Sequence, residues 1–300
     1  MAYLLDITHT LGSIHHISDL GLDRYSTLQL LAKGSSHYCK NNQDILHLAL
    51  SAANKCLKKN QIDLMDIDVV LFGSNSINLL DFKRDIGHDL ISNLGLYHSY
   101  IQFIGFQNCG DLTPILRTAQ AMINSSLAEN ILVIIADDIE DAHLARVVGN
   151  NAYLHSDAAT ACLISKNEGP FQMLDSMIRH IKSEVPLDFN PMDLDSNLDE
   201  LLSAARKFLD NLLFIDLHSS NTYIITHNMS TIFNARVAKI LKIPHQQIYT
   251  QYKLGHCMAS DGLINLSEII VGKNLKKNDI IAVVVPSRRS IGVTVFRYCN

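Results

Sequence analysis

The stretch "IQFIGFQNCGDLTPILRTAQAMI" (residues 101–123) joins two kinds of pattern at one cysteine. Its first part, Ile101 to Phe106, is an apolar run of the length of a buried strand, and its last part has apolar residues at helical spacing. Cys109 stands between them, directly before the expected helix. A helix N-terminus favours negative charge, so this corner suits a nucleophilic thiolate. Taken alone, however, a cysteine is more often a small buried hydrophobic residue, and the rest of the chain has to decide.

Strand and helix patterns alternate along the chain. Short β-branched runs predict strands at residues 68–74, 100–106, 130–137, 160–165, 222–227, 248–252, 279–286 and 292–298. Segments with a period near 3.6 residues predict helices at 43–58, 82–94, 111–126, 198–213, 230–242 and 258–271. Near-continuous apolar strands that alternate with helices are typical of a mainly parallel sheet covered on both faces.

The order of these elements occurs twice, over residues 40–165 and again over 195–298. The period is too long for a solenoid, so the repeat indicates two copies of one α/β unit packed together. We therefore expect two pseudo-duplicated halves, residues 1–166 and 167–300. Segments 139–156 and 166–197 are expected outside the repeat, as loops and covering elements.

Composition limits the classes of function. The chain has 300 residues, of which 47% are hydrophobic and 18% charged, and the charged share is below the usual ~25%. These values indicate extensive buried surface, in thick layers or at a subunit interface. The net charge of −5 and the lack of a basic cluster argue against binding to nucleic acid or to an anionic membrane surface.

The cysteines and the apolar runs bear on the compartment. The six cysteines are scattered, without CxxC spacing, and the N-terminal sequence lacks the pattern of a signal peptide. The apolar runs are far shorter than the ~20 residues of a membrane span. We expect a reduced cytoplasmic protein without a membrane span. The histidines of "SIHHIS" (13–18) lack metal-ligand spacing, and no metal site is expected.

Side chains suited to catalysis fall at the ends of corresponding strands in the two halves. Cys109 has this place in the first half, while His227 in "THNMS" and His256 and Asp261 in "KLGHCMASD" follow strands of the second. Parallel α/β sheets gather their chemistry at the carboxyl ends of strands, so we expect one shared site. An imidazole can exchange a proton with a thiol, and an aspartate can orient the imidazole. Asp261 as a helix cap, and either histidine as a core residue, are the alternatives.

These features together resemble the thiolase superfamily and, within it, the β-ketoacyl-acyl-carrier-protein synthase III enzymes. The segments that carry the resemblance are the corner at Cys109, "SDAATACLIS" (156–165), "THNMSTIFNARVAKILKIP" (226–244) and "LGHCMASDG" (254–262). It extends over nearly the whole chain, weakly at residues 1–40 and 139–200. It implies a five-layer αβαβα fold, usually dimeric. It also implies a cysteine that accepts an acyl group from a thioester of coenzyme A or of an acyl carrier protein, with no permanently bound cofactor.

The resemblance also implies roles for single residues. Cys109 matches the nucleophile, His227 matches the family histidine, and His256 stands where the family has an asparagine. A histidine followed five positions later by Asp261 is similar to relatives that transfer acyl groups without forming a carbon–carbon bond. Ser287, in "PSRRSIG" (286–292), takes the place of a loop glycine that supports the oxyanion hole in the family.

Charged residues near these motifs have two interpretations each. Arg236 and Lys239 lie on the helix after His227, where family members receive an acidic carrier protein, although a solvated helix face would look the same. Asp111 is suited to cap the helix after Cys109, and it would oppose thiolate formation if it pointed inward.

The sequence therefore predicts acyl-thioester transfer through an acyl-cysteine, by a ketosynthase or an acyltransferase of fatty-acid, polyketide or secondary-metabolite biosynthesis. The missing asparagine favours transfer over condensation. A homodimer is expected, or a heterodimer with a paralogue. Two alternatives stay open, namely a non-catalytic subunit that pairs with an active paralogue and a thioester hydrolase.

Overall fold

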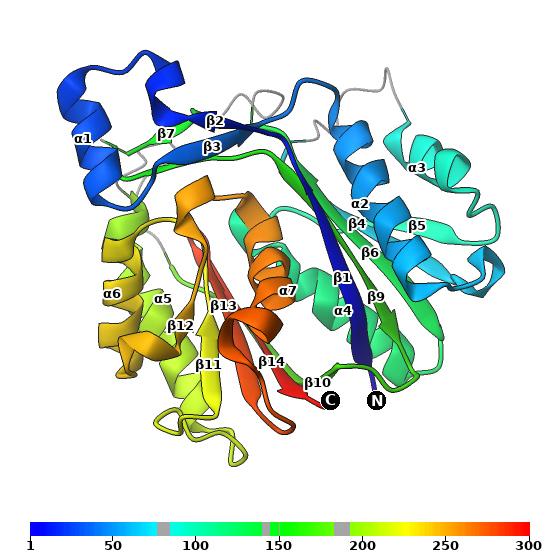
Figure 1. The fold of residues 1–300 in the computed structure, drawn as a ribbon. Coiled ribbons are helices and arrows are strands. Elements are labelled where there is room, and N and C mark those ends of the chain that lie inside the picture. The colour runs from blue at the N-terminus through cyan, green and yellow to red at the C-terminus, as the bar shows by residue number, and fades with distance from the viewer. Residues whose placement is uncertain (77–84, 140–144, 150, 183–192) are drawn as a thin grey trace.

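The computed structural model describes residues 1–76, 85–139, 145–149, 151–182 and 193–300. Its main feature is a ten-stranded sheet in the order β12-β11-β13-β14-β10-β1-β9-β6-β4-β5 (Figure 1). One half of this sheet contains β1 (Tyr3–Leu11), β4 (Val69–Gly73), β5 (Tyr100–Phe103), β6 (Asn130–Asp137) and β9 (Ala158–Ser165). The other contains β10 (Phe171–His180), β11 (Thr222–Ile225), β12 (Ile248–Tyr249), β13 (Ile280–Pro286) and β14 (Ser290–Tyr298).

The two halves follow one topology. Across the sheet in each half, three parallel strands are followed by an antiparallel strand and then by a strand at the junction. The two halves meet where β1 pairs with β10, at Tyr3–Gln172 and Leu4–Phe171. The doubled architecture expected from the sequence is confirmed. The expectation that residues 166–197 lie outside the repeat is wrong for β10, which is the counterpart of β1. Both strands mix polar with apolar residues, and β10 has a bulge between Met173 and Asp175, so neither shows a continuous apolar run.

Seven helices complete the described part of the fold. They are α1 (Arg24–Ala32), α2 (Ile45–Asn60), α3 (Ile86–Leu94), α4 (Leu112–Asn124), α5 (Asp193–Asp210), α6 (Thr231–Leu241) and α7 (Asp261–Lys273). The predicted helices correspond to α2 to α7 with shifted ends, and residues 82–84 of the helix expected at 82–94 lie outside the described residues. The strand predicted at 248–252 is shorter than expected, because only Ile248–Tyr249 pairs.

Side-chain alternation along the buried strands builds a five-layer αβαβα arrangement. In β4, Val69 and Leu71 face the helices α4 and α7, while Val70 and Phe72 face α2 and α3. The other half repeats this pattern, since β13 packs on α4 and α7 with one face and on α5 and α6 with the other. Helices α4 and α7 therefore lie between the half-sheets, and strands covered on both faces need apolar residues at nearly every position.

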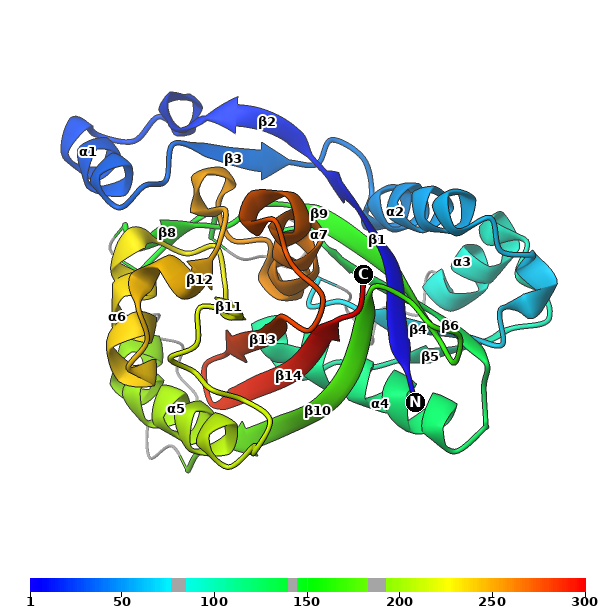
Figure 2. The same cartoon turned by 60° about the horizontal axis from the view of Figure 1, so that its bottom comes forward.

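A smaller unit lies beside the main layers. It contains the hairpin β2 (Ser13–His16) and β3 (His37–Lys40), the helix α1, and the short pair β7 (Val147–Val148) and β8 (Tyr153–Leu154) (Figures 1 and 2). Arg146 and the buried Asp157 form a two-bonded ion pair, of 2.8 and 3.0 Å, that connects this unit to the main sheet. The same carboxylate accepts the backbone N–H groups of Asn41 at 2.7 Å and Ile139 at 2.9 Å.

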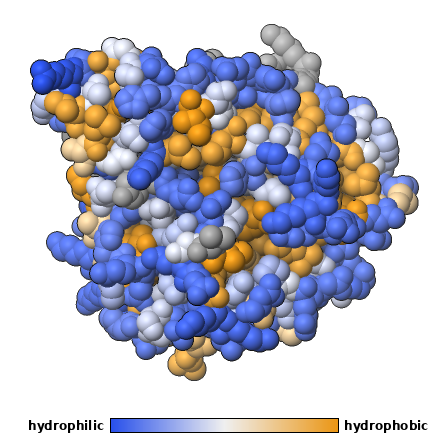
Figure 3. Space-filling view, in the orientation of Figure 1, coloured by the Kyte–Doolittle hydropathy of each residue, from blue (hydrophilic) through white to orange (hydrophobic). Residues whose placement is uncertain are grey.

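The face of the molecule in Figure 3 is mainly hydrophilic, with apolar side chains in separate patches. One such patch overlies α1, where Leu28 and Leu31 are exposed. Among the helices that the structure describes, none combines the length and the apolar character needed to cross a membrane.

Candidate active site

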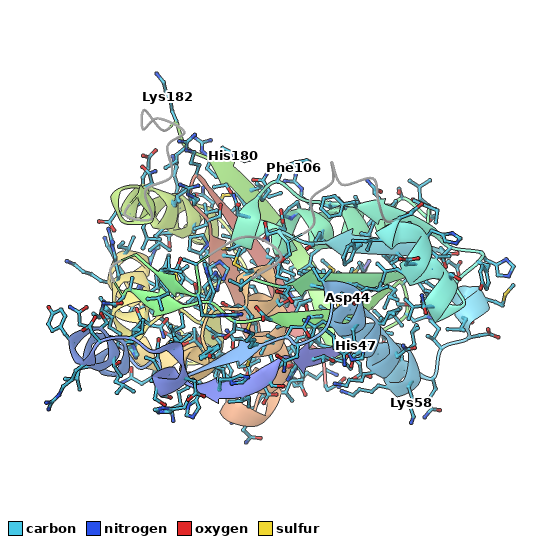
Figure 4. The ribbon with its side chains drawn as sticks, turned by 90° about the horizontal axis from the view of Figure 1, so that it is seen from above. Asp44, His47, Lys58, Phe106, His180 and Lys182 are labelled. Atoms are coloured by element: carbon cyan, nitrogen blue, oxygen red, sulfur yellow. The ribbon has the colours of Figure 1, made fainter. Side chains whose placement is uncertain are left out.

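Cys109 lies in a tight turn between β5 and α4. The turn is a 3₁₀ helix, Asn108–Gly110, and Asn108 before the cysteine has a positive φ of 52°. Phe106, with a φ of 75°, is 85% exposed and points outward (Figure 4). A positive φ is uncommon for residues other than glycine, and such conformations concentrate at functional sites. The turn holds the partly exposed thiol just before the first residue of α4.

His256 is the direct partner of the thiol. Its Nε2 atom lies 3.1 Å from Cys109 Sγ, and its Nδ1–H donates a short hydrogen bond to Asp261 Oδ2. His256 and Asp261 are fully buried and come from the turn before α7 and from its first residue. The sequence predicts that both residues lie near Cys109, and the structure places the three in a line of contacts like that of a nucleophile–His–Asp site.

Asp261 is held by further hydrogen bonds. Its Oδ1 atom accepts Cys257 N–H at 2.9 Å and the Nδ2–H of Asn228 at 3.0 Å, and its Oδ2 atom accepts the backbone N–H of Asn228 at 2.8 Å. A carboxylate surrounded by N–H donors is stabilised in its charged form. Asn228 is not among the site residues that the sequence predicts, because its contact with Asp261 joins segments that are distant in the chain.

The charges of this site support one another. Burial disfavours a charge on His256, but attraction by Asp261 and Cys109 outweighs it and raises the pKa of His256 to about 10. Burial likewise acts to raise the pKa of Asp261, but the positive charge of His256 and the hydrogen bond from His256 hold it below its ordinary value. His256 is therefore positioned to stabilise a negative charge on the neighbouring sulfur.

His227 lies beside Asp261 and His256. Its Nε2–H donates to the carbonyl oxygen of Pro286 at 2.9 Å, and its Nδ1 atom lies 3.5 Å from Asp261 Oδ2. Its ring packs edge-on against that of His256, with 4.6 Å between centroids. Burial lowers the pKa of His227. His227 thus supports the other side of His256, and a direct role with the thioester stays a prediction.

Ser287 lies beneath the turn that holds Cys109. An added Cβ on Gly110 would meet the Ser287 Cβ at 3.5 Å. The backbone N–H of Ser287 donates to Ser290 O at 2.7 Å, and the two hydroxyl groups are 2.9 Å apart. This N–H is therefore engaged in the turn between β13 and β14, which fits the predicted loop support better than a contribution to an oxyanion hole.

Asp111 does not cap α4 with its side chain, and that expectation is wrong. Its Oδ1 atom instead accepts Gln107 N–H at 2.7 Å, which closes the turn around Cys109. At the end of β6, Asp137 similarly accepts Asn75 N–H at 2.6 Å. Burial raises the pKa of each carboxyl group to about 7, and in both the Oδ2 atom is buried without a hydrogen-bond partner among the described residues.

The two residues predicted to bind a carrier lie on α6. The Nε–H of Arg236 donates to Asp199 Oδ1 on α5 at 2.6 Å, so an internal carboxylate partly neutralises its charge. Lys239 is exposed in the last turn of the helix. Their role in carrier binding stays a prediction.

A metal ion is a second possible occupant of the histidine cluster, because ligand atoms of His227, His256 and Asp261 lie within 4.8 Å of one another. However, N–H groups already occupy both oxygens of Asp261, and the carbonyl of Pro286 accepts the Nε2–H of His227. Since hydrogen bonds account for the orientation of these side chains, the donor set fits a proton-transfer site better than a metal centre.

Comparisons with known proteins bear on the family and on the fold. Residues 107–180, which include Cys109, match the family of 3-oxoacyl-[acyl-carrier-protein] synthase III. No curated protein matches the chain in sequence. The chain shares its fold with 3-oxoacyl-[acyl-carrier-protein] synthase III from Aquifex aeolicus, with a TM-score of 0.82 and 17% identity over 99% of this chain and 100% of that one.

Two further structures have the same fold. ChlB3, described as an acyltransferase, gives a TM-score of 0.84 at 16% identity, with 100% of this chain and 98% of that chain covered. OleA of Xanthomonas campestris with bound acetamide gives 0.77 at 15% identity, over 99% and 98%. The predicted resemblance to synthase III-like condensing enzymes and the thiolase-like fold are confirmed. Enzymes of this family are transferases.

Proposed function

We propose that the protein is an acyltransferase that carries an acyl group on Cys109. The supporting observation is the line of contacts from Cys109 Sγ through His256, 3.1 Å away, to Asp261. In the first step, His256 Nε2 takes the thiol proton and the thiolate sulfur attacks the carbonyl carbon of an acyl thioester. The carbon–sulfur bond to the donor breaks, the donor thiolate takes the proton from His256, and acyl-Cys109 remains.

Acylation prepares His256 for the second step. Asp261 and Cys109 both raise the pKa of His256. Once Cys109 carries an acyl group, its sulfur can no longer become an anion, so only the attraction of Asp261 opposes the effect of burial. The pKa of His256 therefore falls in the acyl-enzyme, and His256 becomes the base that takes a proton from the acceptor. The acceptor attacks the acyl carbon, and Cys109 leaves and regains a proton.

Transfer to a protic acceptor is favoured over condensation because of His227. A condensing enzyme needs N–H donors for the enolate oxygen that forms when a malonyl thioester loses carbon dioxide. In this chain, Pro286 O accepts the Nε2–H of His227, and His256 Nε2 faces the sulfur. The triad chemistry needs no resident cofactor, since the acyl thioester is the substrate. Fatty-acid, polyketide or secondary-metabolite biosynthesis would supply such thioesters.

The donor would be acyl-coenzyme A or an acyl carrier protein, the latter docking near Lys239. We also propose a cytoplasmic homodimer, or a heterodimer with a paralogue. A reducing compartment would keep the six cysteines as thiols. Strand β5 ends the sheet and carries the exposed Tyr100, and such an edge can pair with a second chain.

Product analysis tests the reaction type. The enzyme, loaded from an acyl-coenzyme A, is mixed with malonyl thioester, with amines and alcohols, or with buffer alone. An amide or ester product supports transfer, while carbon dioxide and a β-ketoacyl thioester would instead show condensation. Free acid in every mixture would show a hydrolase. Failure of every thioester to acylate Cys109 would favour the non-catalytic subunit, which the intact triad argues against.

A further inference from the structure

His155 is a second imidazole beside the reacting histidine. His256 N–H donates to Leu154 O at 2.7 Å and Ser156 N–H donates to His256 O at 2.9 Å, so the two backbone segments form a short parallel bridge. Residues opposite each other in such a bridge project their side chains to the same side. The ring centroids of His155 and His256 are 5.6 Å apart, and Tyr153 lies within 5.7 Å of each.

The tautomer of His155 follows from its surroundings. Its Nδ1 atom lies 2.9 Å from the carbonyl oxygen of Ala145. A carbonyl can only accept, so Nδ1 carries the hydrogen and Nε2 keeps its lone pair. Burial, together with the positive charges of His256 and Arg146, lowers the pKa of His155 to about 3. His155 is therefore neutral at physiological pH, and its Nε2 atom is a hydrogen-bond acceptor without a partner among the described residues.

The backbone around His155 is fixed firmly. His155 N–H donates to Arg146 O at 2.8 Å, and the guanidinium of Arg146 donates to His155 O at 3.3 Å and to Cys39 O at 3.0 Å. Arg146 itself is held by the buried carboxylate of Asp157. The imidazole is thus preorganised, as a ligand-binding side chain should be.

The number of donor hydrogens on the acyl acceptor decides whether it can hydrogen-bond to both His256 and His155. The hydrogen on its attacking atom goes to His256, so a simple alcohol has none left for a second nitrogen. A primary amine keeps one more N–H, and a vicinal diol keeps its second O–H. When both hydrogens sit on one nitrogen, as in a primary amine, the two hydrogen bonds span about 6 Å between the imidazole nitrogens. The ring centroids of His155 and His256 are 5.6 Å apart, which is a separation of the same size.

We propose that His155 Nε2 accepts a hydrogen bond from the acyl acceptor, and that the site thereby selects acceptors with two donor hydrogens, one for His256 and one for His155. The inference rests on the proposed function and names its acceptor class. His155 would then be a specificity-determining residue, because a bound acceptor keeps water from Nε2, and a one-donor substrate that leaves this nitrogen unpaired is disfavoured.

The test uses four probes in two matched pairs. O-methylhydroxylamine and 1,2-propanediol each offer two donor hydrogens, while N,O-dimethylhydroxylamine and 1-propanol each offer one. Wild-type enzyme and His155→Phe are first acylated from the coenzyme A thioester, among acetyl, butyryl, octanoyl and palmitoyl, that labels Cys109 fastest. Loss of the acyl mass is then followed with each probe. His155→Gln retains an acceptor oxygen, and His47→Phe replaces an exposed histidine on α2 (Figure 4) as the matched control.

The expected readout is the ratio of two-donor to one-donor rates within each pair. Wild type and His47→Phe should show a high ratio, His155→Phe should lower it about tenfold or more, and His155→Gln should restore part of it. An unchanged ratio in His155→Phe would overturn the inference, as would a wild-type ratio like that of the probes in solution. If the His155→Phe change prevents folding, seen as failed acylation, the inference is tested instead by the rate ratios of His155→Gln and His155→Asn. Absence of acyl-Cys109 in the wild type would count against the proposed function instead.

Discussion

Asn228 donates a hydrogen bond to each oxygen of Asp261, from its backbone N–H at 2.8 Å and from Nδ2 at 3.0 Å. The orientation of its amide is settled on the opposite side, where Oδ1 accepts Gln251 N–H at 2.6 Å and the Nδ2–H of Asn265 at 2.9 Å. One side chain therefore connects the end of β11, the start of α7 and the loop after β12, and it holds the triad carboxylate in place.

Asn228→Ala should destabilise the fold and slow the enzyme. The variant leaves the half-buried N–H of Gln251 and the buried Nδ2–H of Asn265 without their acceptor, which costs about 1–3 kcal/mol for each unpaired buried group. Acylation of Cys109 should slow by roughly tenfold, because a misplaced catalytic group loses about that much or more. Urea unfolding and the acylation rate measure the two effects, with Asn221→Ala in an exposed turn as the control. Wild-type stability in Asn228→Ala would contradict the account.

Asp261→Asn removes the negative charge of the side chain and keeps its shape, so it shows how much the acylation of Cys109 depends on that charge. The variant removes the strongest attraction on His256, so the pKa of His256 falls from its value of about 10. Less imidazolium is then present at pH 7 to stabilise the sulfur anion. Acylation should slow by about 10³–10⁴-fold, as for the equivalent change in other nucleophile–His–Asp sites.

The rate at which iodoacetamide alkylates Cys109 is a second, independent measurement on the Asp261→Asn variant. The alkylation rate in Asp261→Asn should fall more at pH 7 than at pH 10. The pKa of His256 is about 10 in the wild type, so its imidazolium is present at pH 7 and already half lost at pH 10. Asp199→Asn, on the surface of α5, should leave the profile unchanged. Identical pH profiles for wild type and Asp261→Asn would mean that His256 does not assist the thiol.

Asp137→Asn should stabilise the protein in a pH-dependent way. The pKa of Asp137 is raised to about 7 by burial, while an unfolded aspartate titrates near 4. Between these values the folded chain holds the extra proton, so the unfolding free energy of the wild type falls by up to ~1.4 kcal/mol for each pH unit. The amide of the Asp137→Asn variant does not titrate, so the variant keeps its unfolding free energy over this pH range. Chemical unfolding at pH 4.5 and 8 should show a gain only at pH 8, and an equal gain at both would contradict the cause.

Gly262→Ala should disturb the central layer beneath the site. An added Cβ would lie 2.3 Å from Leu112 Cδ2 on α4 and 3.0 Å from Val283 Cγ1 on β13. Overpacking of this kind costs about 1–3 kcal/mol. Thermal unfolding should show the loss, and the exposed Ala235→Gly change on α6 should cost only ~1 kcal/mol through helix propensity. A Gly262→Ala variant as stable as wild type would show that α4 and α7 can separate freely.

The sequence predicts the strands that are buried on both faces, because each of them is a continuous apolar run. It does not reveal β1 and β10, whose mixed residues give no such run, and so the junction between the halves stays hidden. The approach of His256 and Asp261 to Cys109 is foreseeable, since all three follow strand ends. The roles of Asn228 and His155 depend on contacts between distant segments, and neither has a local pattern.

The central claim is that Cys109 carries the acyl group, and intact-protein mass spectrometry tests it most directly. Wild type, Cys109→Ala and the control Cys299→Ala are incubated with a panel of acyl-coenzyme A and acyl-carrier thioesters. The account predicts a mass gain of one acyl group in wild type and in Cys299→Ala, and none in Cys109→Ala. A gain that persists in Cys109→Ala, or no gain with any donor although iodoacetamide alkylates Cys109, would contradict it.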